Sequence, residues 1–465
     1  MYEFSMTLGD KENLYEQIYK YIKGEMLEGT LKPGERLPST RVLSQSLGVS
    51  RSTVDLAYQQ LLSEGYISSI PAKGYFVSDM EIFAYAGGEK EEILLEKEEA
   101  QKKPVVDFSL TKIDEDGFPH SYWKKISKKI LDIEDENLYD LGDCRGELSL
   151  RKSITDYLHR FRQVNCHPNQ IVIGAGNDYL AMLLSVLLRE EKYMAMENPT
   201  YKSAADTFVC MGLQVQGIAM DESGMDIDTL MKSEAKVAYV MPSHQFPMGC
   251  VMPIKRRIEL LDWAKRKNGY IIEDDYDSQF RYRGKPIPAL QGLDDQERVI
   301  YLGTFSKSIA PAIRFSYMVL PKSLLERWNA IRESFSVTIS KVDQKIIEEF
   351  LSSGWYERHV NKMRNKYRQK RNLVLGAMKE WNFPYSVSGE EAGLHFVLHL
   401  PFIKSKKDLL FTLKEAGIIL YAPEEYLLSS KTYNEEDFLL GYASLREKEI
   451  GEQIADLGKK IEAFY

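Results

Sequence analysis

The feature that most constrains the fold is a repeated pattern of short apolar runs, each followed at once by glycine or polar residues. The pattern begins near residue 105, and longer segments of helical periodicity separate the runs, which span residues 171–173, 236–241, 270–272 and 299–302. Strands that alternate with helices form a largely parallel sheet, and ligands then gather at the carboxyl ends of its strands. We therefore predict an α/β domain over residues 105–465, with its site at those strand ends.

The whole chain is long enough for two or three domains and has an ordinary soluble composition. Of its 465 residues 44% are hydrophobic and 28% are charged, and the net charge is −8. Because no apolar stretch reaches membrane-spanning length and no signal-peptide pattern is present, we expect a cytoplasmic protein without membrane contact. The cysteines lack CxxC spacing, which predicts free thiols and neither a disulfide framework nor a metal site; they are Cys144, Cys166, Cys210 and Cys250.

The first 79 residues have the pattern of three short helices. Apolar residues recur at helical spacing in the first, namely Leu14, Ile18, Tyr21, Ile22 and Met26. Ser39 is the expected N-cap of a second helix, whose inward-facing residues would be Val42, Leu43 and Leu47. Ser50 can cap a third helix with a buried stripe of Val54, Tyr58, Leu61 and Leu62. The last two helices then form a helix-turn-helix, whose second helix enters the major groove of DNA.

Two short runs after Gly65, residues 66–69 and 74–77, could pair as a two-stranded wing with Lys73 and Gly74 near its tip. The helical pattern alone leaves a second interpretation open, a three-helix packing module that touches no DNA. Residues 1–79 hold fewer Lys and Arg than Asp and Glu. Any contact with DNA therefore depends on locally placed cations rather than on overall charge.

The segment 80–104 differs in composition from the residues on both sides of it, because it is rich in Glu and Lys and ends at a proline. Such a run forms either a solvated helix or a flexible tether, and the sequence leaves both open. In both cases it marks a boundary. The predicted organisation is a DNA-binding domain over 1–79, a charged linker over 80–104 and a large domain over 105–465.

Lys307 follows the last of the apolar runs, with Asp274 upstream of it and Arg314 downstream. A lysine at the mouth of a buried strand can form a Schiff base with pyridoxal 5'-phosphate (PLP). The acid would pair with the pyridine nitrogen, because a neighbouring carboxylate favours the protonated form of that nitrogen. The planar guanidinium would bind the phosphate group.

Each of these motifs has an ordinary alternative when it is taken singly. Gly174 and Gly176 could serve helix packing, or could present the backbone N–H groups of Gly176 and Asn177 to a phosphate. Asp274 could be a helix cap or an ion-pair partner. Tyr201 could be a core residue or an aromatic plate over a planar ring, and His244 could be a loop histidine with satisfied hydrogen bonds.

Two strings in the N-terminal part, Pro33-Gly-Glu-Arg-Leu-Pro-Ser-Thr-Arg41 and Leu47-Gly-Val-Ser-Arg51-Ser-Thr-Val, closely resemble the winged helix-turn-helix of GntR-type bacterial regulators. The resemblance implies that Arg41 and Arg51 contact phosphates and base edges. Ser52 and Thr53 would lie in the groove, and Lys73 with Gly74 would reach the neighbouring minor groove. Asp55 stands where that family often has an arginine.

The larger part has, in order, a Gly-rich turn, Asn-Pro-Thr-Tyr201, Pro-Ser-His244-Gln-Phe-Pro-Met-Gly, Glu-Asp274-Asp-Tyr and Thr-Phe-Ser-Lys307. This order is similar to that of a fold-type I aminotransferase. With the N-terminal domain, the chain resembles the MocR family of PLP-dependent transcriptional regulators, a resemblance that the string Gly354-Trp-Tyr-Glu-Arg-His359 and the string Ala392-Gly-Leu-His395 extend.

The resemblance assigns roles to individual residues. Lys307 would hold PLP as a Schiff base, Asp274 would pair with the ring nitrogen, Tyr276 would hydrogen-bond the ring hydroxyl and Tyr201 would stack on the ring. Phosphate would be bound by the N–H groups of Gly176 and Asn177, the hydroxyls of Thr304 and Ser306, and Arg314. Such domains are normally homodimers, so two winged modules would bind an operator of double-stranded DNA with paired half-sites.

One departure from the aminotransferase pattern bears on function. Near the C-terminus such enzymes usually carry an arginine that binds the substrate α-carboxylate, and Leu439 occupies that place here. Without this clamp a substrate would be poorly oriented. The leading prediction is therefore a transcriptional regulator that senses PLP itself, in the manner of regulators of vitamin B6 biosynthesis, or senses an amine or amino acid that reacts with PLP, at Lys307. The alternatives are a working aminotransferase that carries a DNA-binding module, and a degenerate fold that only dimerises.

Overall fold

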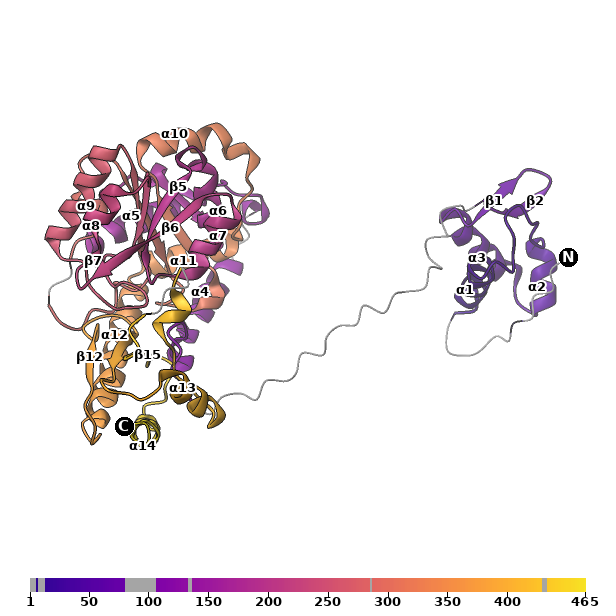
Figure 1. Ribbon diagram of the computed structural model, residues 1–465. Helices are drawn as coiled ribbons and strands as arrows, with labels where there is room; N and C mark the ends of the chain where they lie inside the picture. Colours follow the sequence, from indigo (N-terminus) through magenta and orange to yellow (C-terminus); the bar gives the residue numbers. More distant parts are fainter. Residues whose placement is uncertain (1–5, 7–12, 80–105, 133–135, 285–286, 429–432) are drawn as a thin grey trace. The chain divides into compact units, whose positions relative to one another are not determined.

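A computed structural model describes residue 6 and residues 13–79, 106–132, 136–284, 287–428 and 433–465. They form two compact units, one within Met1–Gln101 and one within Lys102–Tyr465, and each is described by itself (Figure 1). The predicted linker, 80–104, lies outside the described residues.

The smaller unit consists of three helices and a two-stranded wing. The helices are α1 (Leu14–Leu27), α2 (Thr40–Leu47) and α3 (Arg51–Ser63), and the antiparallel strands are β1 (Ile67–Ile70) and β2 (Gly74–Val77). One apolar core, which includes Ile18, Ile22, Val54, Tyr58 and Leu61, holds them together. The predicted helix-turn-helix with a wing is confirmed.

Serine side chains begin the two helices of the helix-turn-helix, as the sequence predicts. The Ser39 hydroxyl accepts a hydrogen bond from the N–H of Val42, and the Ser50 hydroxyl accepts one from the N–H of Thr53. Each bond satisfies an N–H group that has no partner within its helix. Gly48 ends α2 in the left-handed region, with a φ of 68°, where a side chain would be strained.

Two of the predicted inward-facing residues are exposed, and these predictions are wrong. Val42 is 47% exposed because the short α2 turns Thr40, Leu43 and Ser44 inward instead. Leu62 is 39% exposed because the buried stripe of α3 runs through Val54, Ala57, Tyr58 and Leu61. Leu62 is one residue past that stripe, and one residue turns a helix by about 100°.

The larger unit is built on an eight-stranded sheet in the order β4-β11-β10-β9-β8-β5-β6-β7. The strands are β4 (Ile171–Gly174), β5 (Tyr193–Asn198), β6 (Gln214–Asp221), β7 (Gly224–Met225), β8 (Val237–Val240), β9 (Tyr270–Asp275), β10 (Val299–Thr304) and β11 (Ser316–Val319). Pairing is parallel from β10 through β6, whereas β11 is antiparallel to both of its neighbours and β7 is antiparallel to β6. The predicted α/β fold with a mostly parallel sheet is confirmed.

Helices cover both faces of this sheet (Figure 1). They are α4 (His120–Leu131), α5 (Leu148–Arg162), α6 (Asn177–Leu187), α7 (Lys202–Cys210), α8 (Ile227–Lys232), α9 (Ile254–Lys267), α10 (Lys322–Ile331) and α11 (Lys341–Ser352). Successive residues of β9 alternate between two apolar cores, with Ile271 in one and Ile272 in the other. A strand that is buried on both faces is apolar throughout, which explains the continuous runs in the sequence.

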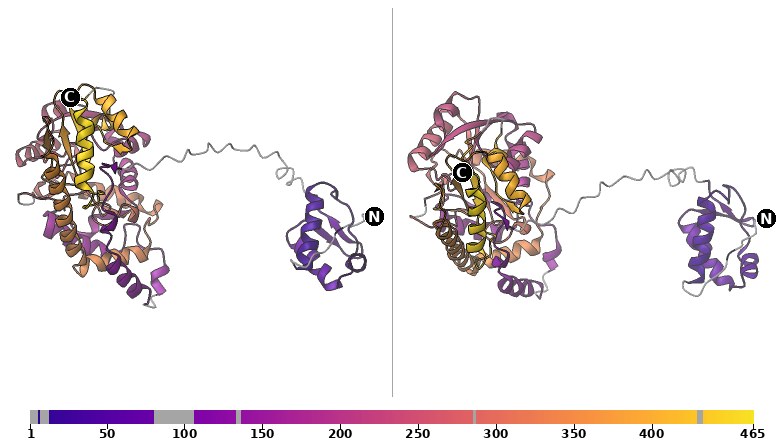
Figure 2. Two further views of the ribbon diagram at one scale, coloured as in Figure 1. Left: turned by 90° about the horizontal axis from the view of Figure 1, so that it is seen from below. Right: turned by 60° about the horizontal axis from the view of Figure 1, so that its bottom comes forward.

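The C-terminal residues form a smaller subdomain around a three-stranded antiparallel sheet of β12 (Ser386–Ser388), β13 (His395–His399) and β15 (Asp437–Gly441). Its helices are α12 (Trp355–Met378), α13 (Lys406–Glu415) and α14 (Ile450–Glu462), and α12 and α14 pack side by side (Figure 2). The short strands β3 (Val106–Asp107) and β14 (Ile418–Ile419) pair in parallel beside it. Across the described segments of the chain, every helix is too short or too polar to span a membrane.

Candidate functional site

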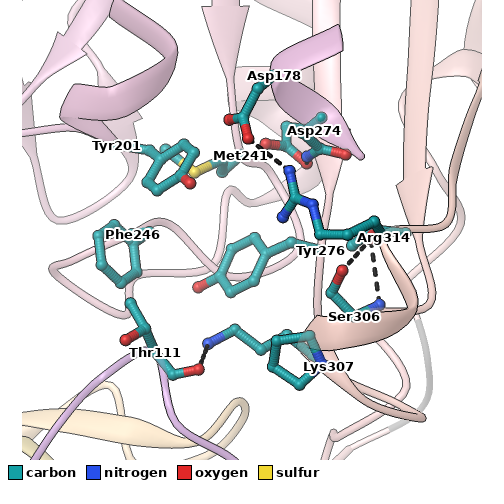
Figure 3. Close-up of a pocket in the computed structure, with 13 residues that line it drawn as sticks. Thr111, Asp178, Tyr201, Met241, Phe246, Asp274, Tyr276, Ser306, Lys307 and Arg314 are labelled. Carbon is teal, nitrogen blue, oxygen red and sulfur yellow. Dashed lines mark hydrogen bonds and ion pairs between the residues drawn. The ribbon is translucent and has the colours of Figure 1, made fainter. Parts of the chain in front are cut away.

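A cavity of about 230 Å³ lies where the loops that follow β5, β8, β9 and β10 meet the N-terminus of α6 (Figure 3). All of the predicted cofactor residues except Gly176 line it, and they come from segments far apart in the sequence. Its walls are Thr111, Asn177, Asp178, Tyr201, Met241, Phe246, Asp274, Tyr276, Thr304, Ser306, Lys307, Pro311 and Arg314.

Lys307 projects from the loop after β10 toward the chain between β3 and α4 (Figure 3). Its Nζ donates hydrogen bonds to the carbonyl oxygens of Leu110, at 3.0 Å, and of Thr111, at 2.8 Å. Burial lowers the pKa of its ammonium group to about 8. About a tenth of this amine is therefore uncharged at pH 7, far more than for a lysine of ordinary pKa, and the uncharged form is the nucleophile.

Asp274, at the end of β9, is 3% exposed. Its carboxylate accepts hydrogen bonds from the Tyr239 hydroxyl and from the Asn177 side-chain amide, the latter at 3.5 Å. Both partners are neutral, so burial raises the pKa of this carboxyl group to about 7. A cationic group of a ligand placed beside Asp274 would supply the missing charge and return the carboxyl to its ionised form.

Arg314 lies beside the N-terminus of α6, where its guanidinium pairs with Asp178 at 2.5 Å. A Cβ at Gly176 would stand 2.4 Å from the Arg314 Nη2, so the glycine is what allows the guanidinium to approach. Arg314 and the α6 N-terminus present cationic character at one place, an arrangement that favours an anion. The Gly176 N–H itself donates to the Gly174 carbonyl at 2.8 Å and is thus engaged within the turn.

The two predicted hydroxyl ligands are joined to one another. Thr304 Oγ1 donates to Ser306 Oγ at 3.1 Å and accepts from the Ser306 N–H at 3.2 Å. The Ser316 hydroxyl also donates to Thr304 at 2.9 Å. Thr304 is buried, and its hydrogen bonds stabilise the turn. Ser306 is half-exposed. The cavity thus offers a hydroxyl and a guanidinium for an anion, a buried acid for a cation and an amine nucleophile.

Sequence reasoning gave no role to a buried histidine network at the edge of the cavity. His244 Nδ1 lies 2.8 Å from an oxygen of Asp277 and 2.9 Å from the Tyr276 hydroxyl. The ring of His395, from β13, lies 5.0 Å from that of His244, and burial lowers the pKa of His395 far below its usual value. Both histidines occur in strings that carry the family resemblance, and this was the sequence signal that could have marked them as functional residues. Only the fold shows that they meet.

Leu439 is fully buried in the middle of β15. Its backbone forms a pair of hydrogen bonds with Tyr421, at 2.9 and 3.4 Å, and its side chain belongs to the same apolar core as Leu428 and Met241. The cavity wall carries positive charge at Lys307 and Arg314, and the latter already pairs with Asp178. At this position of β15 the structure therefore has a buried apolar side chain and no cation that could bind a carboxylate.

In the smaller unit, the predicted DNA contacts lie on α2, on the first turn of α3 and on the wing. Arg41, Arg51 and Ser52 are exposed, as is Lys73 in the turn between β1 and β2. The Ser50 hydroxyl lies 2.8 Å from that of Ser52 and 2.7 Å from that of Thr53, so both predicted groove residues are held to the helix cap. The next residue of the wing, Gly74, has a φ of 107°, which a side chain would strain.

Two protein families match separate parts of the chain. The family of bacterial regulatory proteins called gntR matches residues 14–77, and the family of class I and II aminotransferases matches residues 108–454. These matches define the class of protein: a helix-turn-helix regulator whose larger domain has the aminotransferase fold. The chain belongs to this family of HTH-type transcriptional regulators, and the fusion that the resemblance to MocR proteins implies is confirmed.

Individual relatives agree with that assignment over nearly their whole length. An uncharacterized HTH-type transcriptional regulator of Bacillus subtilis, YdeL, is 38% identical over 96% of both chains. The pyridoxine biosynthesis transcriptional regulator PdxR of Corynebacterium glutamicum is 29% identical over 88% of each. A kynurenine aminotransferase from Pyrococcus horikoshii has a similar fold, with a TM-score of 0.70 and 24% identity over 78% of this chain and 92% of that one.

Proposed function

We propose that this transcriptional regulator binds PLP at Lys307 and that occupancy of the cavity changes how its helix-turn-helix domains engage DNA. The observation that carries the proposal is the pairing of two displaced pKa values in one cavity: Lys307 near 8 and Asp274 near 7. Such displacements are typical of functional sites, where a ligand supplies the missing partner. PLP has an aldehyde for the amine, a ring nitrogen for the acid and a phosphate for Arg314.

Each side chain of the cavity has a task in this proposal. Arg314, the Ser306 hydroxyl and the first N–H groups of α6, beginning at Asn177, bind the phosphate. Asp274 holds the proton on the ring nitrogen, because its ionised form is favoured only when a cation lies beside it. Tyr201 packs on the ring, and Tyr276, held by His244, donates to the ring hydroxyl. PLP, when bound, supplies an electrophilic carbon that exchanges between Lys307 and free primary amines.

The effector is PLP itself or a primary amine without an α-carboxylate. Buried Leu439 gives such a carboxylate no partner, and a carboxylate left unpaired in the cavity is unfavourable. The function named for PdxR, the regulation of pyridoxine biosynthesis, supports PLP as the signal. The second candidate is an active aminotransferase, which the presence of Lys307, Asp274 and Arg314 together favours.

The regulator acts in the cytoplasm as a homodimer on paired half-sites. Two large apolar side chains before α5, Tyr139 and Leu141, are 79% and 86% exposed, and apolar groups this exposed are often covered by a partner. A dimer would carry two helix-turn-helix domains, and their linkage raises affinity for a two-part operator. In the proposed division of each chain into 1–79, 80–104 and 105–465, the linker allows each DNA-binding domain to approach its own half-site.

The test follows the visible absorbance of bound PLP and the footprint on the protein's own upstream DNA in parallel. Lys307→Ala should lose the absorbance and the PLP-dependent change of footprint together. Lys322→Ala, which alters a surface ion pair with Glu297, is the matched control and should keep both. A Lys307→Ala variant whose footprint still responds to PLP would refute the sensor proposal. Stoichiometric conversion of bound PLP to its amino form by amino acids would favour the enzyme instead.

A further inference from the structure

Asp55 lies one turn after Arg51 on the exposed side of α3, at the end of the helix that enters the groove. The Arg51 Nε is 3.8 Å from the Asp55 carboxylate, and the two side chains are 69% and 40% exposed. The same Nε donates to the Thr40 hydroxyl of α2 at 3.4 Å. The guanidinium is thereby held between the two helices, with the carboxylate directly beside it.

The position of this acid contrasts with that of the other acid near the helix, Glu64. Glu64 forms the C-cap of α3 and accepts hydrogen bonds from Tyr19, at 2.5 Å, and Lys23, at 3.3 Å. It therefore links α3 to α1 within the unit. Asp55 is in the second turn, where residues of a recognition helix face base edges. A carboxylate placed there among DNA phosphates is repelled unless a base donates a hydrogen bond to it.

The bases differ in what they offer to a carboxylate in the major groove. Cytosine presents its N4 amino group, which donates, without an acceptor next to it on the same edge. Adenine presents the N6 amino group beside the N7 acceptor, and that acceptor repels a second carboxylate oxygen. Guanine presents only acceptors there and suits an arginine. A neighbouring Arg51 and Asp55 therefore match a guanine and a cytosine at adjoining positions.

We propose that Asp55 is a specificity-determining residue of α3, where it accepts a hydrogen bond from the N4 amino group of a cytosine while Arg51 binds a guanine. Residues 1–79 hold fewer cations than anions, so this unit gains selectivity from placed contacts more than from general attraction to DNA. The proposal concerns base recognition by α3 and is independent of whether PLP is the signal.

The experiment selects binding sites from random double-stranded DNA with the full chain. It compares the unaltered protein with Asp55→Asn, Asp55→Ala and the control Glu28→Gln, a change at the exposed C-cap of α1. The unaltered protein and the control should select the same half-site, with one cytosine preferred about tenfold or more. Asp55→Asn should replace that cytosine by adenine, because an amide both donates to N7 and accepts from N6.

Asp55→Ala should lose the preference at that single position and keep the rest of the half-site. Removing a negative charge should also leave binding to non-specific DNA at low salt as strong or stronger. Circular dichroism and thermal unfolding establish that each variant is folded. Identical base preferences in all four proteins would overturn the proposal. Loss of all DNA binding by folded Asp55→Ala would do so too, because Asp55 would then be needed for binding to every sequence and not for the choice of one base.

Discussion

The two candidate surfaces of this protein are built in opposite ways. In the helix-turn-helix unit the residues predicted to contact DNA are exposed or half-exposed and come from one short stretch, from Arg41 to Gly74. In the larger unit the residues that line the cavity are buried or half-buried except Thr111, Pro311 and Arg314, and they extend from Thr111 to Arg314 along the chain. The first surface is therefore positioned by three helices with their own core. The second is positioned by the whole sheet and by the contacts between its loops.

Because of this difference, function and stability depend on different residues in the helix-turn-helix unit and on the same residues in the larger unit. An exposed residue such as Arg51 contributes little to folding, so base recognition can change by single substitutions. Asp274 is fully enclosed, and its ionised form is unfavourable until a ligand arrives. Substitutions in the cavity should therefore alter stability and ligand binding together, whereas substitutions of the exposed Arg51 and Asp55 on α3 should alter DNA binding alone.

The largest effect on stability is expected from Leu439→Arg. A guanidinium in place of this fully buried side chain would lack a partner, and the free energy of unfolding of the larger unit should fall by about 3–5 kcal/mol. Leu439→Met conserves volume and should cost less than about 1.5 kcal/mol. Denaturant unfolding measures both. If Leu439→Arg unfolds like the unaltered protein, the β15 position opens to water and the reason for excluding carboxylate effectors disappears.

Asp274→Asn should stabilise the PLP-free protein and weaken PLP binding. The pKa of Asp274 in the folded chain, about 7, is above its unfolded value of 3.8, so its stabilising effect is complete below pH 4 and is lost as pH rises through 7. The variant cannot ionise. The free energy of unfolding of the variant should therefore equal that of the unaltered protein near pH 4. At pH 8 it should be higher, by roughly 4 kcal/mol as an upper bound.

Thermal unfolding across this pH range tests the stability effect, and a PLP titration at pH 8 tests the binding effect, with an expected loss of about 100-fold. Asp178→Asn is the matched control, because Asp178 lines the same cavity but is half-exposed beside Arg314. It should not reproduce the pH dependence. An Asp274→Asn protein that binds PLP as tightly as the unaltered one would show that the carboxylate does not meet the ring nitrogen.

The same contrast explains what the sequence could predict. Ser39 and Ser50 were predicted as caps because a cap depends on residues next to it in the chain, and apolar periodicity placed the sheet and its polar strand ends. The outward position of Val42 depends on how a short helix rests on its neighbours. The meeting of His244 with His395, and of Lys307 with the carbonyl of Thr111, requires the packed fold. Local sequence patterns contain no information on the distance between residues that lie so far apart in the chain.

Arg51→Ala should weaken DNA binding by about tenfold or more without effect on the larger unit. The free energy of unfolding of the helix-turn-helix unit should change by no more than about 0.5 kcal/mol, since the side chain is 69% exposed, and PLP absorbance should stay the same. Lys32→Ala, at an exposed residue between α1 and α2, is the control. If affinity falls equally for all sequences, Arg51 binds phosphate and not a base.

The smallest effect is expected from Ser50→Ala, which removes the cap of α3 but no proposed base contact. The hydroxyl accepts from the N–H of Thr53 at 3.1 Å, and its loss should reduce the free energy of unfolding of the small unit by about 1 kcal/mol. Ser46→Ala, on the exposed side of α2, should have no such effect. Because the helix remains folded at room temperature, operator affinity should change little, while thermal unfolding shifts. A large loss of operator affinity without a shift in unfolding would mean that the Ser50 hydroxyl itself contacts DNA, and the separation of stability from recognition on α3 would fail there.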